Sequence, residues 1–201
     1  MKLWCGRDLC INTAFLLLIV IVVNGCAYRL GLGERSLPGG YRQLAIPVFK
    51  NKTQEVGLEV DFTNALIREF ERSKVAEVVP LDAATIKLEG EISSLKVESR
   101  SAALGTNGDN GEISALPSDV VLTTSYRLVV TINLNLIRMS DQSILWSGRV
   151  SNEKVYSAPR IGSQVVNSAN TTYNQSARQI NTISLAKEMM QEVHGRMTEN
   201  F

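Results

Sequence analysis

The residues with the clearest chemistry are Val23-Asn24-Gly25-Cys26, which close a long apolar run near the start of the chain. A cysteine directly after a small residue, where a signal sequence is cut, offers a thiol that can carry lipid. Lys2 and Arg7 precede the run, so a charged start, an apolar middle and a small-residue cleavage site are all present. We predict that residues 1–25 are a lipoprotein signal peptide. Cys26 would then begin the mature chain with a diacylglycerol and an N-acyl chain such as palmitate.

Two other interpretations of this segment stay open. A membrane-spanning helix needs about 20 apolar residues, and the run from Ile11 to Val23 approaches that length only by including Asn12 and other polar neighbours. The segment would then be an uncleaved anchor. The other interpretation is an ordinary signal peptide followed by a cysteine that carries no lipid. Ala27, not aspartate, follows Cys26, which favours the outer membrane if enterobacterial sorting rules apply.

The remaining composition excludes several classes of function. Cys5 and Cys10 leave with the predicted signal peptide, so no disulfide or cysteine metal site is expected. The chain has 21 Lys plus Arg against 20 Asp plus Glu, a net charge of +1, whereas nucleic-acid binders usually show a clear basic excess. Most catalytic and metal sites need several His or Cys residues or clustered carboxylates, whereas His194 is the single histidine of the chain. We interpret it as a surface or helix-end residue. We therefore expect no cofactor, no metal and no nucleic acid.

Glu89 and Glu91 share one face of a predicted strand, and paired carboxylates can perform general acid/base catalysis. No third group and no pocket signature accompany them, so we interpret them as a solvated strand face. The chain is predicted not to be an enzyme. A cleft between two close carboxyl groups would revive the hypothesis of an envelope hydrolase.

The first half of the mature chain predicts a strand, a helix and two further strands. Tyr41–Lys50 alternates loosely and contains Pro47, which places it at a sheet edge or a bulge. Glu55–Lys74 changes to helical spacing, with an apolar stripe that includes Phe62 and Phe70. Short and long strands follow at residues 75–80 and 85–99.

The strand over residues 85–99 changes the parity of its apolar residues. Ile86 and Ile92 share one parity, whereas Leu95 and Val97 have the other. A β-bulge near Ser93-Ser94 would return all of them to the same face. We predict such a bulge.

The second half of the chain predicts a hairpin and a long helix. Residues 126–137 alternate cleanly and residues 144–156 less so, with a turn at 140–143 between them, which indicates an antiparallel hairpin. The loop 100–124 shows no periodicity, and we expect it to be mobile, with a role in binding as the alternative. Apolar residues then repeat at helical spacing in the last helix: Ala177, Ile180, Ile183, Ala186, Met190, Val193 and Met197.

These elements predict an α+β fold, a two-layer sandwich in which two helices pack on one face of a mostly antiparallel sheet of about four strands. The other face of the sheet is left free. A Gly-rich tether, residues 26–40, connects the predicted lipid to a single domain, residues 41–201.

Four stretches carry a resemblance to a known family: Gly25-Cys26-Ala27-Tyr28-Arg29-Leu30, Leu37-Pro38-Gly39-Gly40, the run from Ile46 to Glu59, and Tyr126-Arg127-Leu128-Val129-Val130-Thr131-Ile132. Together they resemble the LPS-assembly lipoprotein LptE family over essentially the whole mature chain. Two departures are Ala27, where glycine is common, and the long loop after Arg100.

The resemblance implies an outer-membrane lipoprotein that plugs the LptD β-barrel, helps it to assemble and binds lipopolysaccharide. It implies that the protein is anchored by its lipid to the outer membrane, on the periplasmic side and in the lumen of the barrel. Three arginines, Arg127, Arg138 and Arg149, could supply positive charge for lipid A phosphates, which guanidinium groups grip well. Solvated charges or contacts with acidic barrel residues are the alternatives. The alternative function is a stand-alone periplasmic-face lipoprotein that supports another envelope transport or secretion complex.

Overall fold

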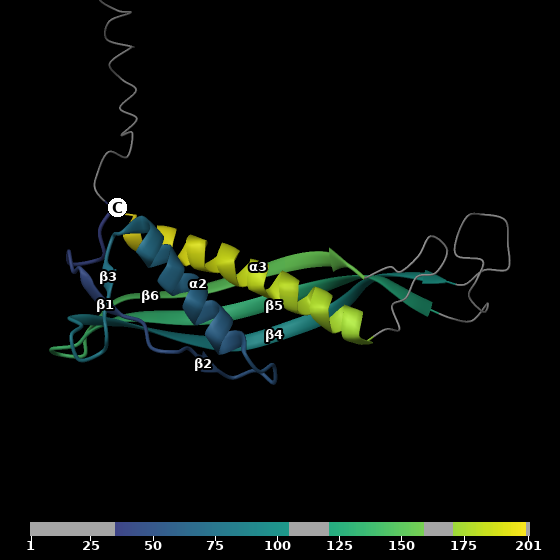
Figure 1. Ribbon diagram of the computed structural model, residues 1–201, viewed down its shortest axis with the longest axis horizontal. Coiled ribbons are helices and arrows are strands. Elements are labelled where there is room, and N and C mark those ends of the chain that lie inside the picture. Colours follow the sequence, from purple (N-terminus) through teal and green to yellow (C-terminus); the bar gives the residue numbers. More distant parts are fainter. Residues whose placement is uncertain (1–34, 105–120, 159–170, 200–201) are drawn as a thin grey trace, which may run out of the picture. The chain divides into compact units, whose positions relative to one another are not determined.

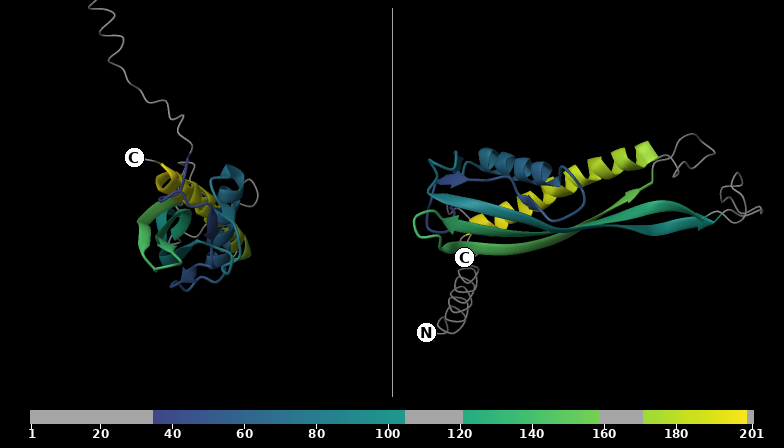
Figure 2. Two further views of the ribbon diagram at one scale, coloured as in Figure 1. Left: turned by 90° about the vertical axis from the view of Figure 1, so that its left-hand side faces the viewer. Right: turned by 90° about the horizontal axis from the view of Figure 1, so that it is seen from below.

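Two helices lie on one face of a six-stranded sheet (Figure 1; Figure 2). The computed structural model describes residues 35–104, 121–158 and 171–199 of the 201-residue chain. The predicted signal peptide, Cys26, most of the tether and the middle of the loop 100–124 lie outside these residues. The predicted α+β fold is confirmed, although the sheet has six strands where about four were expected.

The elements follow the chain in the order strand, strand, helix, four strands, helix. Their bounds are β1 Gln43–Ala45, β2 Lys50–Asn51, α2 Leu58–Ser73, β3 Glu77–Val78, β4 Ile86–Leu104, β5 Val121–Arg138, β6 Ile144–Ser157 and α3 Thr171–Thr198. The predicted loop 100–124 is wrong at both ends, because residues 100–104 continue β4 and residues 121–124 begin β5, where the two strands pair.

The sheet is built on the three long strands β4, β5 and β6, which pair antiparallel as predicted for the hairpin. The strand order is β3-β1-β4-β5-β6, and β2 pairs separately with β4. The pairs β1–β3, β1–β4 and β2–β4 are all parallel. Parallel pairing requires a long crossover connection, which α2 supplies between the short strands and the rest of the sheet.

The bulge predicted near Ser93-Ser94 is present in β4. Its register against β5 slips between Ile92 and Ser94, and the Ser93 hydroxyl donates to the Thr131 carbonyl oxygen at 3.0 Å. Beyond the slip, Leu95 lies opposite Val130 and packs against the core. One inserted residue thus keeps a long strand apolar toward the helices on both sides of the bulge.

The predicted strand Tyr41–Lys50 is in fact two short strands with Pro47 between them. Proline has no N–H to donate, so the ladder stops there. β1 lies inside the sheet, between β3 and β4, whereas β2 pairs only with β4 among the described strands, so the predicted edge position is correct for β2 and wrong for β1. After Pro47 the loose alternation does not continue, because Val48 is 65% exposed and Phe49 is 3% exposed.

The helix predicted over Glu55–Lys74 begins at Leu58, directly after Gly57. Gly57 has φ of 95°, a left-handed conformation that costs other L-residues energy, so glycine suits this helix entry. The predicted stripe is confirmed, since Phe62 and Phe70 are fully buried.

The stripe predicted for the last helix is wrong at two positions. Ile180 is 67% exposed and Ile183 is 44% exposed, whereas Ala186 and Met190 are fully buried. An α-helix turns about 100° per residue, so each step of three residues shifts a side chain by about 60° around the axis. The spacing of three from Ala186 back through Ile183 to Ile180 therefore carries both isoleucines off the core face.

Gly90 of β4 lies under the ring of Phe49, and a Cβ at position 90 would come within 2.6 Å of two ring carbons. Phe49 has little freedom to move, since it is buried and its N–H donates to the Thr63 hydroxyl at 3.0 Å. We expect Gly90→Ala to lower the free energy of unfolding by about 1–3 kcal/mol, as overpacked cores do. Urea unfolding measures this loss. The control is Ser147→Ala, because Ser147 is an exposed residue of β6. We expect no change in the free energy of unfolding for this variant.

Candidate partner-binding surface

The face of β4, β5 and β6 that points away from the helices is polar in its middle. Strand register sets three rows across it: Ser94–Thr131–Ser151, Glu91–Asn133–Arg149 and Glu89–Asn135–Ser147. The hydroxyl oxygens of Thr131 and Ser151 are 3.0 Å apart, within hydrogen-bond distance. The opposite side chains of β5, such as Leu128 and Leu134, are fully buried under the helices. The sheet therefore separates an apolar core from a polar surface.

The carboxylates on this face are paired with lysines. Glu89 Oε1 lies 2.8 Å from Lys87 Nζ, and Glu91 Oε1 lies 2.9 Å from Lys52 Nζ. The hydrogen bond from Lys87 holds the pKa of Glu89 below its usual value. A general acid needs a raised pKa, so the structure gives the hydrolase hypothesis no support at this pair.

The three arginines named from the sequence do not converge. Arg127 is ion-paired with Glu153, and its Nε donates to that carboxylate at 2.7 Å. Arg149 lies opposite Asn133, six residues along β5 from Arg127, which is about 20 Å at 3.3 Å per residue. The two cannot grip one phosphate group.

Arg138 lies at the end of β5, away from both. Its Nη1 donates to Asp141 Oδ2 at 3.0 Å, and its guanidinium carbon is 5.8 Å from the centre of the Tyr41 ring. Within the described part of the chain, Arg149 alone of the three makes no hydrogen bond or ion pair. Their role in lipopolysaccharide or partner contact stays a prediction.

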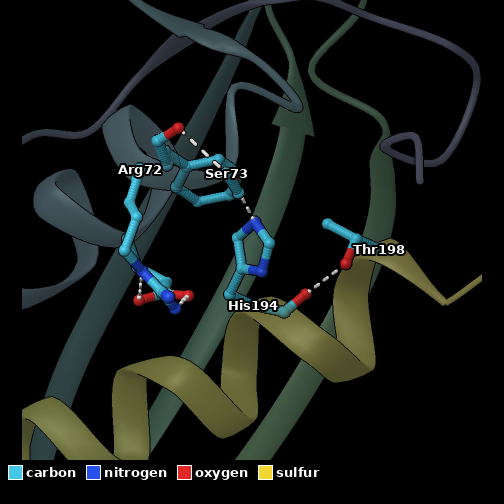
Figure 3. A network of polar contacts seen from close by, with 6 residues as sticks. Arg72, Ser73, His194 and Thr198 are labelled. Atoms are coloured by element: carbon cyan, nitrogen blue, oxygen red, sulfur yellow. Dashed lines mark hydrogen bonds and ion pairs between the residues drawn. The ribbon is translucent and has the colours of Figure 1, made fainter. Parts of the chain in front are cut away.

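The histidine is buried between the two helices, so the expectation of a surface position is wrong. His194 is 2% exposed, and its Nε2 lies 2.8 Å from the Ser73 hydroxyl at the end of α2 (Figure 3). Its ring meets the edge of Phe70, with 4.9 Å between ring centres. Burial lowers the pKa of His194, the Glu69 carboxylate opposes this, and Arg35 and Arg72 add to it. The residue therefore joins α2 to α3 as a neutral imidazole.

This junction predicts a pH-dependent stability. The folded-state pKa of His194 is below its unfolded value of about 6.5, so folding is favoured most above that value. Stability is then lost as the pH falls from about 6.5 toward the folded-state pKa. We expect the urea midpoint to fall between pH 7 and pH 5.5, where this histidine is the only side chain with an ordinary pKa in range.

The matched control is His194→Gln, whose amide can still reach Ser73 but does not titrate. Its urea midpoint should be lower overall and nearly flat over the same pH range. An equal slope in both proteins would show that the titration belongs to another group.

Two further features of the described residues bear on function. Among residues 35–104, 121–158 and 171–199, no group of three or more His, Cys, Asp or Glu side chains is placed to hold a metal ion. Within the same residues, no helix has the length and apolarity needed to cross a bilayer.

A family model described as LptE, lipopolysaccharide-assembly, matches residues 41–197. The chain belongs to the LptE family. The resemblance inferred from the sequence is thereby confirmed over the folded unit. This LptE-family chain is thus assigned to lipopolysaccharide assembly in the cell envelope, in a family of lipoproteins that are not enzymes.

Solved structures show more distant likeness to this LptE-family chain. Protein CT253 from Chlamydia trachomatis is 10% identical, with 80% of this chain and 99% of that chain covered at a TM-score of 0.47. Rare lipoprotein B from Shewanella oneidensis is 14% identical, with 78% and 90% covered at a TM-score of 0.36. A lipoprotein from Caulobacter crescentus is 11% identical, with 75% and 88% covered at a TM-score of 0.43. No curated protein matches the sequence. The family assignment therefore rests on the family match.

Proposed function

We propose that this protein is an outer-membrane lipoprotein that sits as a plug in an LptD-type β-barrel, helps the barrel to assemble and assists lipopolysaccharide transport to the cell surface. Residues 1–25 are the signal peptide in this proposal, Cys26 carries the lipid, residues 26–40 are the tether and residues 41–201 are the plug domain. Family membership supports the proposal.

The observation that carries it is the polar, helix-free face of β4, β5 and β6. The lumen of a large outer-membrane barrel is polar, and a protein seated there needs a surface that satisfies polar wall residues. Hydroxyls and amides fill the middle of this face, and its charges are of both signs. Apart from Arg149, the charges in these rows are already paired, so little of the surface would bury an unpaired charge against the wall, which would be costly.

Arg149 is the residue of this face best placed to meet an anion. It is exposed and keeps its donors free within the described residues, whereas Arg127 and Arg138 are already paired. A phosphate of lipopolysaccharide or an acidic residue of the barrel wall is its expected contact.

Gentle extraction tests the proposal. The full-length lipidated chain, tagged at its C-terminus, is solubilised from outer membranes in mild detergent and purified. A one-to-one complex with a large β-barrel protein, retaining lipopolysaccharide, is expected. Recovery of the chain alone contradicts the plug role. Ring-shaped oligomers of the chain would instead support the alternative of a stand-alone lipoprotein in another envelope complex.

A further inference from the structure

A groove of about 400 Å³ lies along β4 directly after the bulge. It is lined by residues 93–97 of β4, by residues 52–55 between β2 and α2, and by Arg178 of α3. Its volume is within the range of binding pockets, about 300–1,000 Å³. It adjoins the polar sheet face at Ser94 and shares no lining residue with the histidine junction.

The groove opens because β2 leaves β4 at this point. The last contact is the Lys52 N–H, which donates to the Ile92 carbonyl oxygen at 3.0 Å. Asn51 then turns the chain away: its Oδ1 accepts from the Thr53 N–H at 2.9 Å, and its Nδ2 donates to the Glu55 carbonyl oxygen at 2.6 Å. Figure 1 shows the chain looping from β2 into α2 beside β4.

The outer edge of β4 is left without a partner strand. β4 continues to Leu104 and pairs with β5 on its inner side, but among the described residues no strand pairs with its outer side after Ile92. An open edge presents backbone N–H and C=O groups that an added strand can pair with. The five β4 residues that line the groove span about 16 Å at 3.3 Å per residue.

The groove carries an excess of positive charge. Three cations line it, Lys52, Lys96 and Arg178, against one carboxylate, Glu55, which is ion-paired with Arg178. Lys96 is exposed and makes no hydrogen bond or ion pair within the described residues. The side chain of Lys52 is 63% exposed even in its pair with Glu91. A segment bound here would therefore be favoured by carboxylates.

We propose that this groove binds an extended, acidic segment of the barrel partner, whose backbone continues the sheet beside β4 and whose carboxylates meet Lys52 and Lys96. The identity of the partner rests on the proposed function. A second copy of this chain is a poorer fit, because edge-to-edge pairing would bring like charges together at Lys96. A phosphate group would meet the lysines but leave the backbone edge of β4 unpaired.

Hydrogen exchange tests the backbone pairing. The free lipidated chain is compared with the purified barrel complex, and the amides of residues 93–99 are followed by mass spectrometry. Slower exchange of these amides by at least tenfold in the complex is expected. Unchanged exchange would overturn the added strand, whatever happens elsewhere on the surface.

Charge reversal tests the side-chain contacts. Lys52→Glu with Lys96→Glu is compared with a control pair on the helices, Arg68→Glu with Lys187→Glu, which changes the net charge equally at exposed positions. At least a fivefold loss of barrel recovery is expected for the groove pair and little change for the control. Thermal unfolding midpoints near that of the wild type establish that both variants fold. Equal recovery for both pairs would overturn the proposal.

A photocrosslinker at position 96 distinguishes between the possible occupants of the groove. A crosslink to a carboxylate-rich barrel segment supports the proposal, and one to lipopolysaccharide or to a second copy overturns it. If the wild-type chain brings down no barrel, the proposed function fails. In that case a crosslink from position 96 to an acidic segment of another envelope protein, together with slower amide exchange at residues 93–99 in that complex, would still show strand addition at β4.

Discussion

Replacing Cys26 with serine is expected to abolish lipid attachment completely. The lipid is predicted to bond to the thiol sulfur, and a serine hydroxyl is a far weaker nucleophile at neutral pH. Each buried CH₂ of an acyl chain contributes about 0.8 kcal/mol to membrane binding, and stable anchoring takes two signals, such as two acyl chains. The variant should therefore lose its place in the outer-membrane fraction.

Intact-mass measurement checks this prediction. The wild-type chain should begin at Cys26 and carry the added mass of a diacylglycerol and an N-acyl chain, and the Cys26→Ser variant should carry neither. Cys10→Ser is the matched control, because Cys10 lies in the predicted signal peptide and should leave the mature product unchanged. A wild-type product that retains residues 1–25 with a free thiol would refute the lipoprotein interpretation and favour an uncleaved anchor.

Replacing Leu185 with alanine is expected to lower the free energy of unfolding by about 2–5 kcal/mol, a large share of the roughly 5–15 kcal/mol typical of a domain. Leu185 is fully buried in the shared core of the helices and the sheet. Its truncation removes apolar contacts and leaves a cavity that rigid neighbours fill only in part.

The matched control is Ile180→Ala on the same helix. Ile180 is 67% exposed, so its truncation should change the free energy of unfolding by less than about 0.5 kcal/mol. Urea unfolding of the compact unit Arg35–Phe201 measures both. Equal losses for the two variants would mean that the exposed isoleucine is covered in solution.

The two-layer arrangement followed from local patterns because those patterns are geometric. Side chains alternate with a period of two along a strand, so the change of parity between Ile92 and Leu95 already requires an extra residue at Ser93. The spacing of Phe62, Leu66 and Phe70 likewise places one face of α2 against a core. The sheet face opposite the helices could be anticipated as polar for the same reason.

The partners of charged residues could not be predicted in this way. Lys52 meets Glu91 only because β2 runs beside β4, and His194 meets Ser73 only because the ends of α2 and α3 cross. These contacts join residues far apart in the chain, and no local spacing encodes them. The groove beside β4 could not be predicted for the same reason, because its lining residues come from β4, from the segment before α2 and from α3.

By itself the sequence determined the α+β class, the bulge in β4 and the buried faces of α2 and β5, because each depends on residue type and local period; lipid attachment at Cys26 stays a prediction. Only the tertiary structure decided that Ile180 is exposed, that His194 is buried and neutral, and that an edge of β4 is open beside three cations. The physical reason is that burial, charge pairing and open edges depend on which segments the folded chain brings together.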